Sequence, residues 1–211
     1  MEKELIKRNE LLAKETIKGL TKRGFEAYYC DSPQAAKAVA LSLIPPSHVV
    51  SWGGSRTCEQ LGIYEAIKET NPVIDRAEGK TPEEAKALMK KALLCDTFVT
   101  GANGITVDGQ LFNIDGNGNR VAAMTFGPDS VIVIAGVNKI SHNLESAIER
   151  ARNVAAPTNA QRFDVDIPCK VNGKCSDCLS PSSICTYFSQ IRRCNPPGRI
   201  KVILVNEELG F

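Results

Sequence analysis

The sequence predicts one α/β domain, residues 1–211, in which helices cover both faces of a mainly parallel sheet. Two observations lead to this prediction. Segments with helical spacing of apolar residues alternate along the chain with short apolar runs, which is typical of βαβ units. The chain is 43% hydrophobic but only 6% aromatic, so its core must consist mainly of Val, Ile, Leu and Ala, as in a covered parallel sheet.

Turn and capping residues set the borders of the expected elements. Gly24 is suited to end an N-terminal amphipathic helix, and Ser32 before Pro33 and Thr81 before Pro82 are suited to cap the starts of later helices. The expected helices cover residues 2–23, 33–44, 57–68, 82–94 and 144–154, the last broken by Ala156-Pro157. The expected strands cover residues 25–30, 48–52, 97–100, 131–135 and 199–205.

Two insertions interrupt this alternation. Residues 104–126 contain three turn-forming pairs between short apolar segments, namely Asp108-Gly109, Asp115-Gly116 and Asn117-Gly118. Because such pairs tolerate positive φ angles, they predict an antiparallel hairpin insertion. The second insertion is a cysteine-rich metal loop over residues 166–198, from which the chain returns to the sheet through residues 199–205.

Five cysteines lie in the second insertion. Cys169, Cys175, Cys178, Cys185 and Cys194 have the spacing C-x5-C-x2-C-x6-C-x8-C. A C-x-x-C pair places two sulfurs on one tight turn, and a bound metal would supply folding free energy that a Gly- and Ser-rich loop lacks. The irregular spacing favours a [4Fe–4S] cluster. A structural zinc site and free or disulfide-linked thiols remain the alternatives.

The N-terminal residues and the net charge of the chain indicate the cellular location of the protein and the kinds of partner that it binds. The chain begins Met1-Glu2-Lys3-Glu4, without an apolar signal segment, and no apolar run approaches membrane-spanning length. We therefore expect a cytoplasmic protein with reduced cysteines and no membrane partner. The net charge of +2 and the lack of a basic stripe argue against a nucleic-acid partner. A homo-oligomer is compatible with the sequence.

Small and polar residues follow three predicted strands, in segments 53–55, 101–104 and 136–139. Open α/β sheets bind ligands beyond the carboxyl ends of their strands. Glycines before a helix allow backbone N–H groups to approach an anion, although a tight packing turn explains them equally well. The candidates for binding a small anionic or carboxylate ligand are Gly53, Gly54, Ser55, Thr57, Asn103, Asp115 and Lys139. No motif assigns a catalytic residue.

Five segments of the sequence carry a resemblance to a known family. They are VVSWGGSRTCEQLGIYEAI, TGANGITVDGQLFNIDGNGNRVAAMTFGP, VIVIAGVNKI, SAIERARNVAAPTNAQR and RIKVILVNEELGF. Over nearly its whole length, the chain resembles the lactate-utilization (LUD) domain family. The resemblance implies a fold like that of the sugar-phosphate isomerases and coenzyme A transferases, with the ligand crevice at the strand ends. Arg56 stands where the family more often has a small apolar residue.

Some members of that family carry a cysteine segment similar to PCKVNGKCSDCLSPSSIC, which is regarded as an iron–sulfur motif. The resemblance therefore implies Cys169, Cys175, Cys178 and Cys185 as ligands of a [4Fe–4S] cluster and leaves Cys194 outside the set. It also implies a part in the oxidation of lactate to pyruvate, together with iron–sulfur oxidoreductase partner subunits.

Two functions from different classes are compatible with these observations. The first is a component of lactate or small-carboxylate utilization, in which the cluster passes or stores electrons and the crevice binds the acid. No flavin or nicotinamide motif supplies a hydride acceptor, so the sequence leaves open whether the chain alone is an enzyme. The alternative is a non-catalytic small-ligand-binding or redox-sensing module with a structural zinc site.

Overall fold

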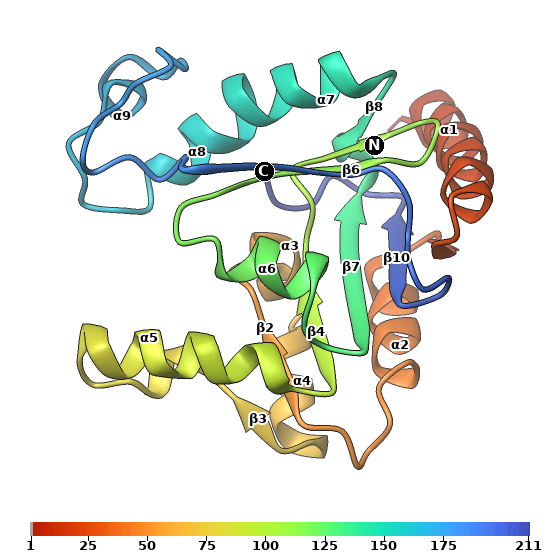
Figure 1. Ribbon diagram of the computed structural model, residues 1–211. Helices are drawn as coiled ribbons and strands as arrows, with labels where there is room; N and C mark the ends of the chain where they lie inside the picture. Colours follow the sequence, from red (N-terminus) through yellow and green to blue (C-terminus); the bar gives the residue numbers. More distant parts are fainter. Residues whose placement is uncertain (1) are drawn as a thin grey trace.

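The computed structural model describes residues 2–211 and contains two β-sheets (Figure 1). The larger sheet has six parallel strands in the order β1-β10-β7-β4-β2-β3. These strands are β1 (Glu26–Cys30), β2 (Val50–Trp52), β3 (Val73–Ile74), β4 (Thr97–Thr100), β7 (Ser130–Gly136) and β10 (Ile200–Val205). The prediction of an α/β fold with a mainly parallel sheet is confirmed.

Side chains of the central strand β7 alternate between the two faces of this sheet. Val131, Val133 and Ala135 pack into one core cluster, whereas Ile132 and Ile134 pack into the other. The first face is covered by α1 (Lys3–Lys22), α6 (Asn119–Thr125) and the smaller sheet, and the second by α2 (Pro33–Ser42), α3 (Arg56–Gln60) and α4 (Ile63–Thr70). Burial on both faces explains why β7 is a continuous apolar run.

The predicted helix borders at serine, threonine and glycine are confirmed. The Ser32 hydroxyl accepts a hydrogen bond from the Ala35 N–H at the start of α2. The Thr81 hydroxyl does the same for the Glu84 N–H at the start of α5 (Pro82–Lys91), which a 3₁₀ turn, Ala92–Leu94, follows. These side chains satisfy backbone donors that have no partner within the first helical turn.

Two helix predictions need correction. The helix expected over residues 57–68 is divided into α3 and α4, because Gly62 takes a left-handed conformation with φ of 60°. The helix expected to break at Ala156-Pro157 instead continues from α7 (Leu144–Arg150) through a π-helical turn, Ala151–Ala155, into α8 (Ala156–Ala160). The wider hydrogen-bonding pattern of the π turn accommodates Pro157, which has no N–H to donate.

The smaller sheet is mixed and has the order β8-β5-β6-β9. Its strands are β5 (Gly104–Thr106), β6 (Leu111–Asp115), β8 (Ile140–Ser141) and β9 (Tyr187–Ile191). The expected hairpin is present as the antiparallel pair of β5 and β6. The rest of the insertion predicted over residues 104–126 differs, because Gly118, with φ of 79°, begins the helix α6.

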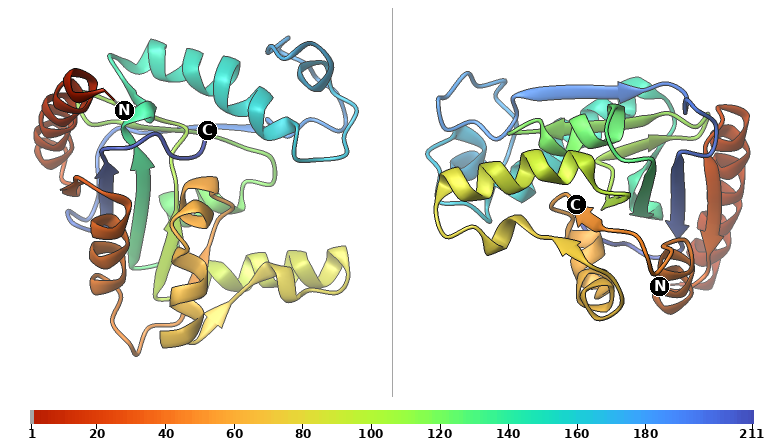
Figure 2. Two further views of the ribbon diagram at one scale, coloured as in Figure 1. Left: turned by 180° about the vertical axis from the view of Figure 1, so that it is seen from behind. Right: turned by 60° about the horizontal axis from the view of Figure 1, so that its bottom comes forward.

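The cysteine-rich segment, residues 166–198, leaves the body after α8 and contains α9 (Pro168–Asn172) and β9. Figures 1 and 2 show the part around α9 projecting at one end of the molecule. Strand β9 pairs antiparallel with β6, which the sequence did not predict. The return to the large sheet through residues 199–205 is confirmed, since β10 pairs with both β1 and β7. Within residues 2–211, no helix has the length and apolar character needed to cross a bilayer.

Candidate functional site

A cleft of about 630 Å³ lies at the carboxyl ends of β2, β4 and β7. Residues that follow each of these strands line it: Gly54 and Ser55, then Gly101 to Asn103, then Lys139. Asp115, at the end of β6, also lines it. The three rims predicted from the strand ends therefore meet around one space, which we call the crevice. A wider cleft of about 900 Å³ beside α1 is lined by none of the predicted site residues.

Lys139 is the buried cation of the crevice, with 4% of its surface exposed. Its Nζ donates to the Thr57 hydroxyl at 2.8 Å, and that hydroxyl donates to the Leu209 carbonyl at 3.2 Å. Thr57 thus lies behind Lys139 and holds it. Burial, together with the positive charges of Arg150 and Arg120, lowers the pKa of Lys139 to about 7. An anion in the crevice would keep this lysine protonated.

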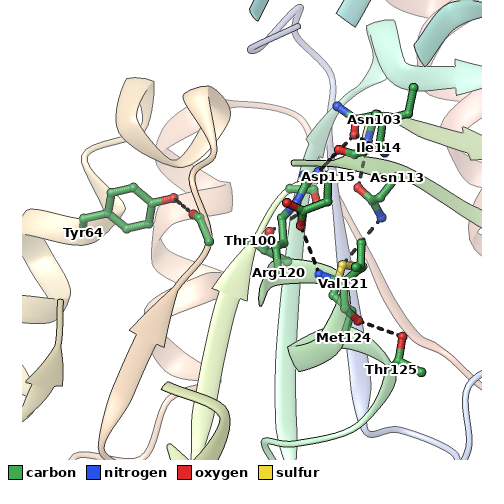
Figure 3. Close-up of polar contacts among 12 residues, drawn as sticks. Tyr64, Thr100, Asn103, Asn113, Ile114, Asp115, Arg120, Val121, Met124 and Thr125 are labelled. Atoms are coloured by element: carbon green, nitrogen blue, oxygen red, sulfur yellow. Dashed lines mark hydrogen bonds and ion pairs between the residues drawn. The ribbon is translucent and has the colours of Figure 1, made fainter. Parts of the chain in front are cut away.

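Arg120 is a second cation of the crevice, and no pattern in the sequence predicted it. Its Nη2 donates to the Ile114 carbonyl at 2.6 Å and to the Asn103 Oδ1 at 3.2 Å, and its Nε lies 3.5 Å from the Asp115 carboxylate (Figure 3). Its Nη1 has no hydrogen bond to any residue that the structure describes. Burial lowers the pKa of Arg120, and nearby Arg76 lowers it further. The guanidinium is thus fixed on one side and free on the other.

The Gly53-Gly54 turn makes room for two arginines. A Cβ atom on Gly53 would lie 2.9 Å from the Arg120 Cγ, and one on Gly54 would lie 3.0 Å from the Arg76 Nη2. The two glycines therefore allow the two guanidinium side chains to pack against the turn after β2. Gly54 also lines the crevice, so direct approach of the backbone to a ligand stays a prediction.

Arg150 connects two rims of the crevice from α7. Its guanidinium donates to the Asn103 carbonyl at 2.6 Å and to the Asn138 carbonyl at 2.7 Å. Since these carbonyls follow β4 and β7, one side chain fixes the distance between the two rims. The crevice is therefore held open by hydrogen bonds that need no ligand.

Positive charge dominates the lining of the crevice. The cationic side chains in its lining are those of Arg56, Arg76, Arg120, Lys139 and Arg162, and the acidic side chains are those of Glu59 and Asp115; Phe211 also lines it. Glu59 pairs with Arg56 at 3.0 Å and with Arg162 at 3.3 Å. Both carboxylates are thus engaged by arginines, and with Lys139 protonated the lining keeps an excess of positive charge. Such a site can bind a small anion.

The four cysteines of the predicted ligand set lie in one region. Burial, together with the nearby charges of Cys169, Cys175 and Cys178, raises the pKa of the Cys185 thiol to about 11. Cys185 packs on a small apolar cluster that includes Ile114, and Cys169 belongs to another. All eight cysteines are free, so no disulfide occupies these sulfurs.

The C-x-x-C turn between Cys175 and Cys178 has an unusual backbone. Asp177, with φ of 50°, is the only residue other than glycine that has a positive φ within the described part of the chain. Arg152, in the π turn, donates to the Asp177 carboxylate at 2.6 Å and to the Cys175 sulfur at 3.6 Å. Strained backbone of this kind concentrates at functional sites, so this turn is a candidate metal-binding element.

Cys194 lies elsewhere. It is 1% exposed, packs in the core of the large sheet and accepts a hydrogen bond from the Ile200 N–H at 3.2 Å. Cys30, Cys58 and Cys95 are also buried away from the segment. Cys194 is therefore a buried core residue in the loop that precedes β10.

The cysteine segment forms one wall of the crevice. Ser183, Ile184 and Cys185 line the same space as Lys139. A Cβ atom on Gly116 would lie 3.2 Å from the Ile184 carbonyl, so the turn after β6 and the cysteine segment are in close contact. The two candidate sites adjoin through Cys185.

Comparison with known proteins agrees with this architecture. A family model described as LUD domain matches residues 13–205. The chain belongs to the LUD domain family. A duf162 family protein from Deinococcus radiodurans has a similar crystal structure, with a TM-score of 0.54 and 13% identity over 93% of this chain and 98% of that chain. That likeness shows the fold shared by the two chains.

Two further solved structures are similar to smaller extents. One is ribose 5 phosphate isomerase A from Neisseria gonorrhoeae, with a TM-score of 0.35 and 16% identity over 53% of this chain and 53% of that chain. The other is the tetrameric eIF2B-beta2-delta2 complex from C. thermophilum, with a TM-score of 0.44 and 18% identity over 83% of this chain and 56% of that chain. No curated protein matches the chain.

Proposed function

We propose that this LUD domain protein takes part in the utilization of lactate or a similar small carboxylate, with a [4Fe–4S] cluster in its cysteine segment. The observation that supports this proposal most directly is the shared wall, because Cys185 lines the crevice that contains Lys139. A carboxylate bound to Lys139 would lie beside a ligand of the cluster. Binding and electron transfer would thus take place at adjoining sites.

The residues of the cysteine segment fit a cluster. The donor set consists of four thiols, Cys169, Cys175, Cys178 and Cys185, as a [4Fe–4S] cluster requires. A single zinc ion needs all its ligands at about 2.3 Å from one point. Within residues 2–211, no three of the His, Cys, Asp or Glu side chains converge in that way. A cluster binds each thiolate through a different iron, so it does not need such close convergence.

The crevice residues would hold the carboxylate and exclude other orientations. The Lys139 ammonium and the free Nη1 of Arg120 are the donors available to a carboxylate, and Asn103 fixes Arg120 from the other side. When bound, the cluster supplies one-electron transfer, so two-electron oxidation of a 2-hydroxy acid requires a further acceptor. Iron–sulfur oxidoreductase partner subunits would provide it.

Anaerobic purification followed by iron, sulfide and zinc analysis tests the metal. We expect about four irons and four sulfides per chain and an electron paramagnetic resonance signal of the reduced protein that changes when L-lactate is added. About one zinc per chain without visible absorbance would instead support a non-catalytic ligand-binding or redox-sensing module. An iron–sulfur signal that is insensitive to saturating lactate would remove lactate from the proposal.

A further inference from the structure

The crevice contains more positive charge than a ligand with one carboxylate can neutralise. Arg76 lines it and, among residues 2–211, has neither an ion pair nor a hydrogen bond with another side chain. Lys139 has a hydroxyl as its partner, not a carboxylate. Asp115 faces Arg120 at the long distance of 3.5 Å. Three cationic side chains are thus poorly compensated within one space.

These cations are also close enough to repel one another. The charge of Arg76 lowers the pKa of Arg120, and the charge of Arg120 lowers the pKa of Lys139, in both cases in addition to burial. Like charges in a partly buried site destabilise the folded protein unless a counter-charge is present. A cation cluster of this kind is therefore best explained by a bound anion.

The arrangement separates the cations into two groups. Arg76 and Arg120 pack on the Gly53-Gly54 turn, whereas Lys139 follows β7 and is held by Thr57 from α3. The planar guanidinium group of arginine can donate two parallel hydrogen bonds to an oxyanion, whereas the ammonium group of lysine acts as a point charge. Each of the two sets of cations can therefore bind a different anionic group of the same ligand.

We infer that the crevice takes a small anion with two negative charges, either a dicarboxylate or a phosphate monoester, with one charge at Arg76 and Arg120. The second carboxylate of a dicarboxylate, or another oxygen of the phosphate group, faces Lys139. This inference rests on the proposed function in that both use the same crevice, and it narrows the ligand class. Arg76, which is exposed and unpaired, discriminates between doubly and singly charged ligands.

Isothermal titration calorimetry of the anaerobically purified protein at neutral pH and low salt tests this inference. The probes are malonate, sulfate and L-lactate. We expect malonate or sulfate to bind at least tenfold more tightly than lactate. Arg76→Ala should weaken binding of the double anion at least fivefold and change lactate binding less. Lys22→Ala removes one exposed charge from α1, outside the crevice, and should leave all three affinities unchanged.

The outcomes separate this inference from the proposed function. Lactate binding as tight as or tighter than that of both double anions overturns the inference and leaves the proposed function standing. Double anions that bind while lactate does not support the inference and remove lactate as the ligand. If none of the three probes binds, both are overturned. Arg120→Lys keeps the positive charge but removes the paired donors of the guanidinium group. Loss of the preference for double anions in that variant further supports recognition by Arg120.

Discussion

The crevice and the cysteine segment adjoin, but they are held in place in different ways. In the crevice, Arg150 connects the rims after β4 and β7 and Arg120 connects Asn103 to the end of β6. In the cysteine segment, Val171 and Leu179 are 86% and 97% exposed. Before β9, that segment contacts the body mainly through two small apolar clusters, and β9 itself pairs with β6.

The two sites should therefore differ in what they need in order to form. The crevice depends on buried strands and on hydrogen bonds within the fold, so it should be present whether or not metal is bound. The part of the cysteine segment before β9 leaves large apolar side chains exposed, so metal binding should supply much of its stability. Replacing single residues in each region can test this contrast.

The largest expected effect is loss of the metal. Changing Cys169, Cys175, Cys178 or Cys185 to Ser removes one thiolate, and we expect each change to abolish or sharply reduce the iron content because the remaining ligands cannot complete the set. Iron and sulfide analysis with visible absorbance measures this effect. Cys194→Ser is the matched control, since Cys194 lies in the core of the large sheet and should not change the metal content.

The second-largest expected effect is a loss of order in the cysteine segment when the metal is removed, which limited proteolysis measures. Lys174 is exposed within the cysteine segment, and we expect trypsin to cleave after it much faster once the metal has been removed by a chelator. Cleavage after Lys139 and Arg150 should stay slow with or without metal, since both are fixed in the crevice. Equal protection of Lys174 in both forms would show that the segment is ordered without metal.

Anion binding should respond to Lys139. The change Lys139→Met removes a charged donor and should weaken binding of the crevice ligand by about 1.5–3 kcal/mol, the usual contribution of a hydrogen bond to a charged group. Titration calorimetry with malonate measures the effect, and circular dichroism checks the fold. Unchanged affinity in a folded variant would place the anion away from Lys139. Iron content should be unaffected.

The smallest effect is the pH dependence of that binding. Because the pKa of Lys139 in the free protein is about 7, an anion that binds the protonated form must raise this pKa. Affinity should therefore fall as pH rises above 7, by up to about tenfold per pH unit, and binding should take up a proton. Titrations in buffers of different ionisation enthalpy detect that proton. In Lys139→Met the affinity should be nearly independent of pH over this range.

The same group affects the stability of the ligand-free protein. The folded pKa of Lys139 lies below its ordinary value of 10.5, so the unfolded chain binds more protons between these two values. The contribution of Lys139 to the free energy of unfolding should therefore rise as pH increases from 7 towards 10.5. Urea denaturation of the wild type and of Lys139→Met at several pH values measures this contribution.

The parts of the fold that follow from local pattern were predictable. The apolar run over residues 131–135 allows few conformations other than a buried strand, and the rule for strand ends is enough to place Lys139 and Asn103 on the same crevice. The N-caps at Ser32 and Thr81 were predictable because side chains of neighbouring residues decide them.

What could not be predicted depends on pairing between distant segments. The Asn117-Gly118 pair is typical of a hairpin turn, yet Gly118 begins α6, and this helix places Arg120 over the turn after β2. Strand β9 is half polar and largely exposed, so only its pairing with β6 makes it a strand. Arg76 was missed because nothing in its sequence neighbourhood distinguishes it from an ordinary surface arginine.

A ligand in the crevice should lie beside a cluster held by the cysteine segment, and the proposed function depends on this adjacency. A reductive titration of the purified protein, followed by electron paramagnetic resonance with and without saturating malonate, tests it most directly. We predict a cluster signal whose reduction potential falls when malonate binds, since added negative charge disfavours reduction, with a smaller shift in Lys139→Met. A potential that is unchanged at saturation, or a protein that contains zinc and gives no signal, would contradict the adjacency of ligand and cluster.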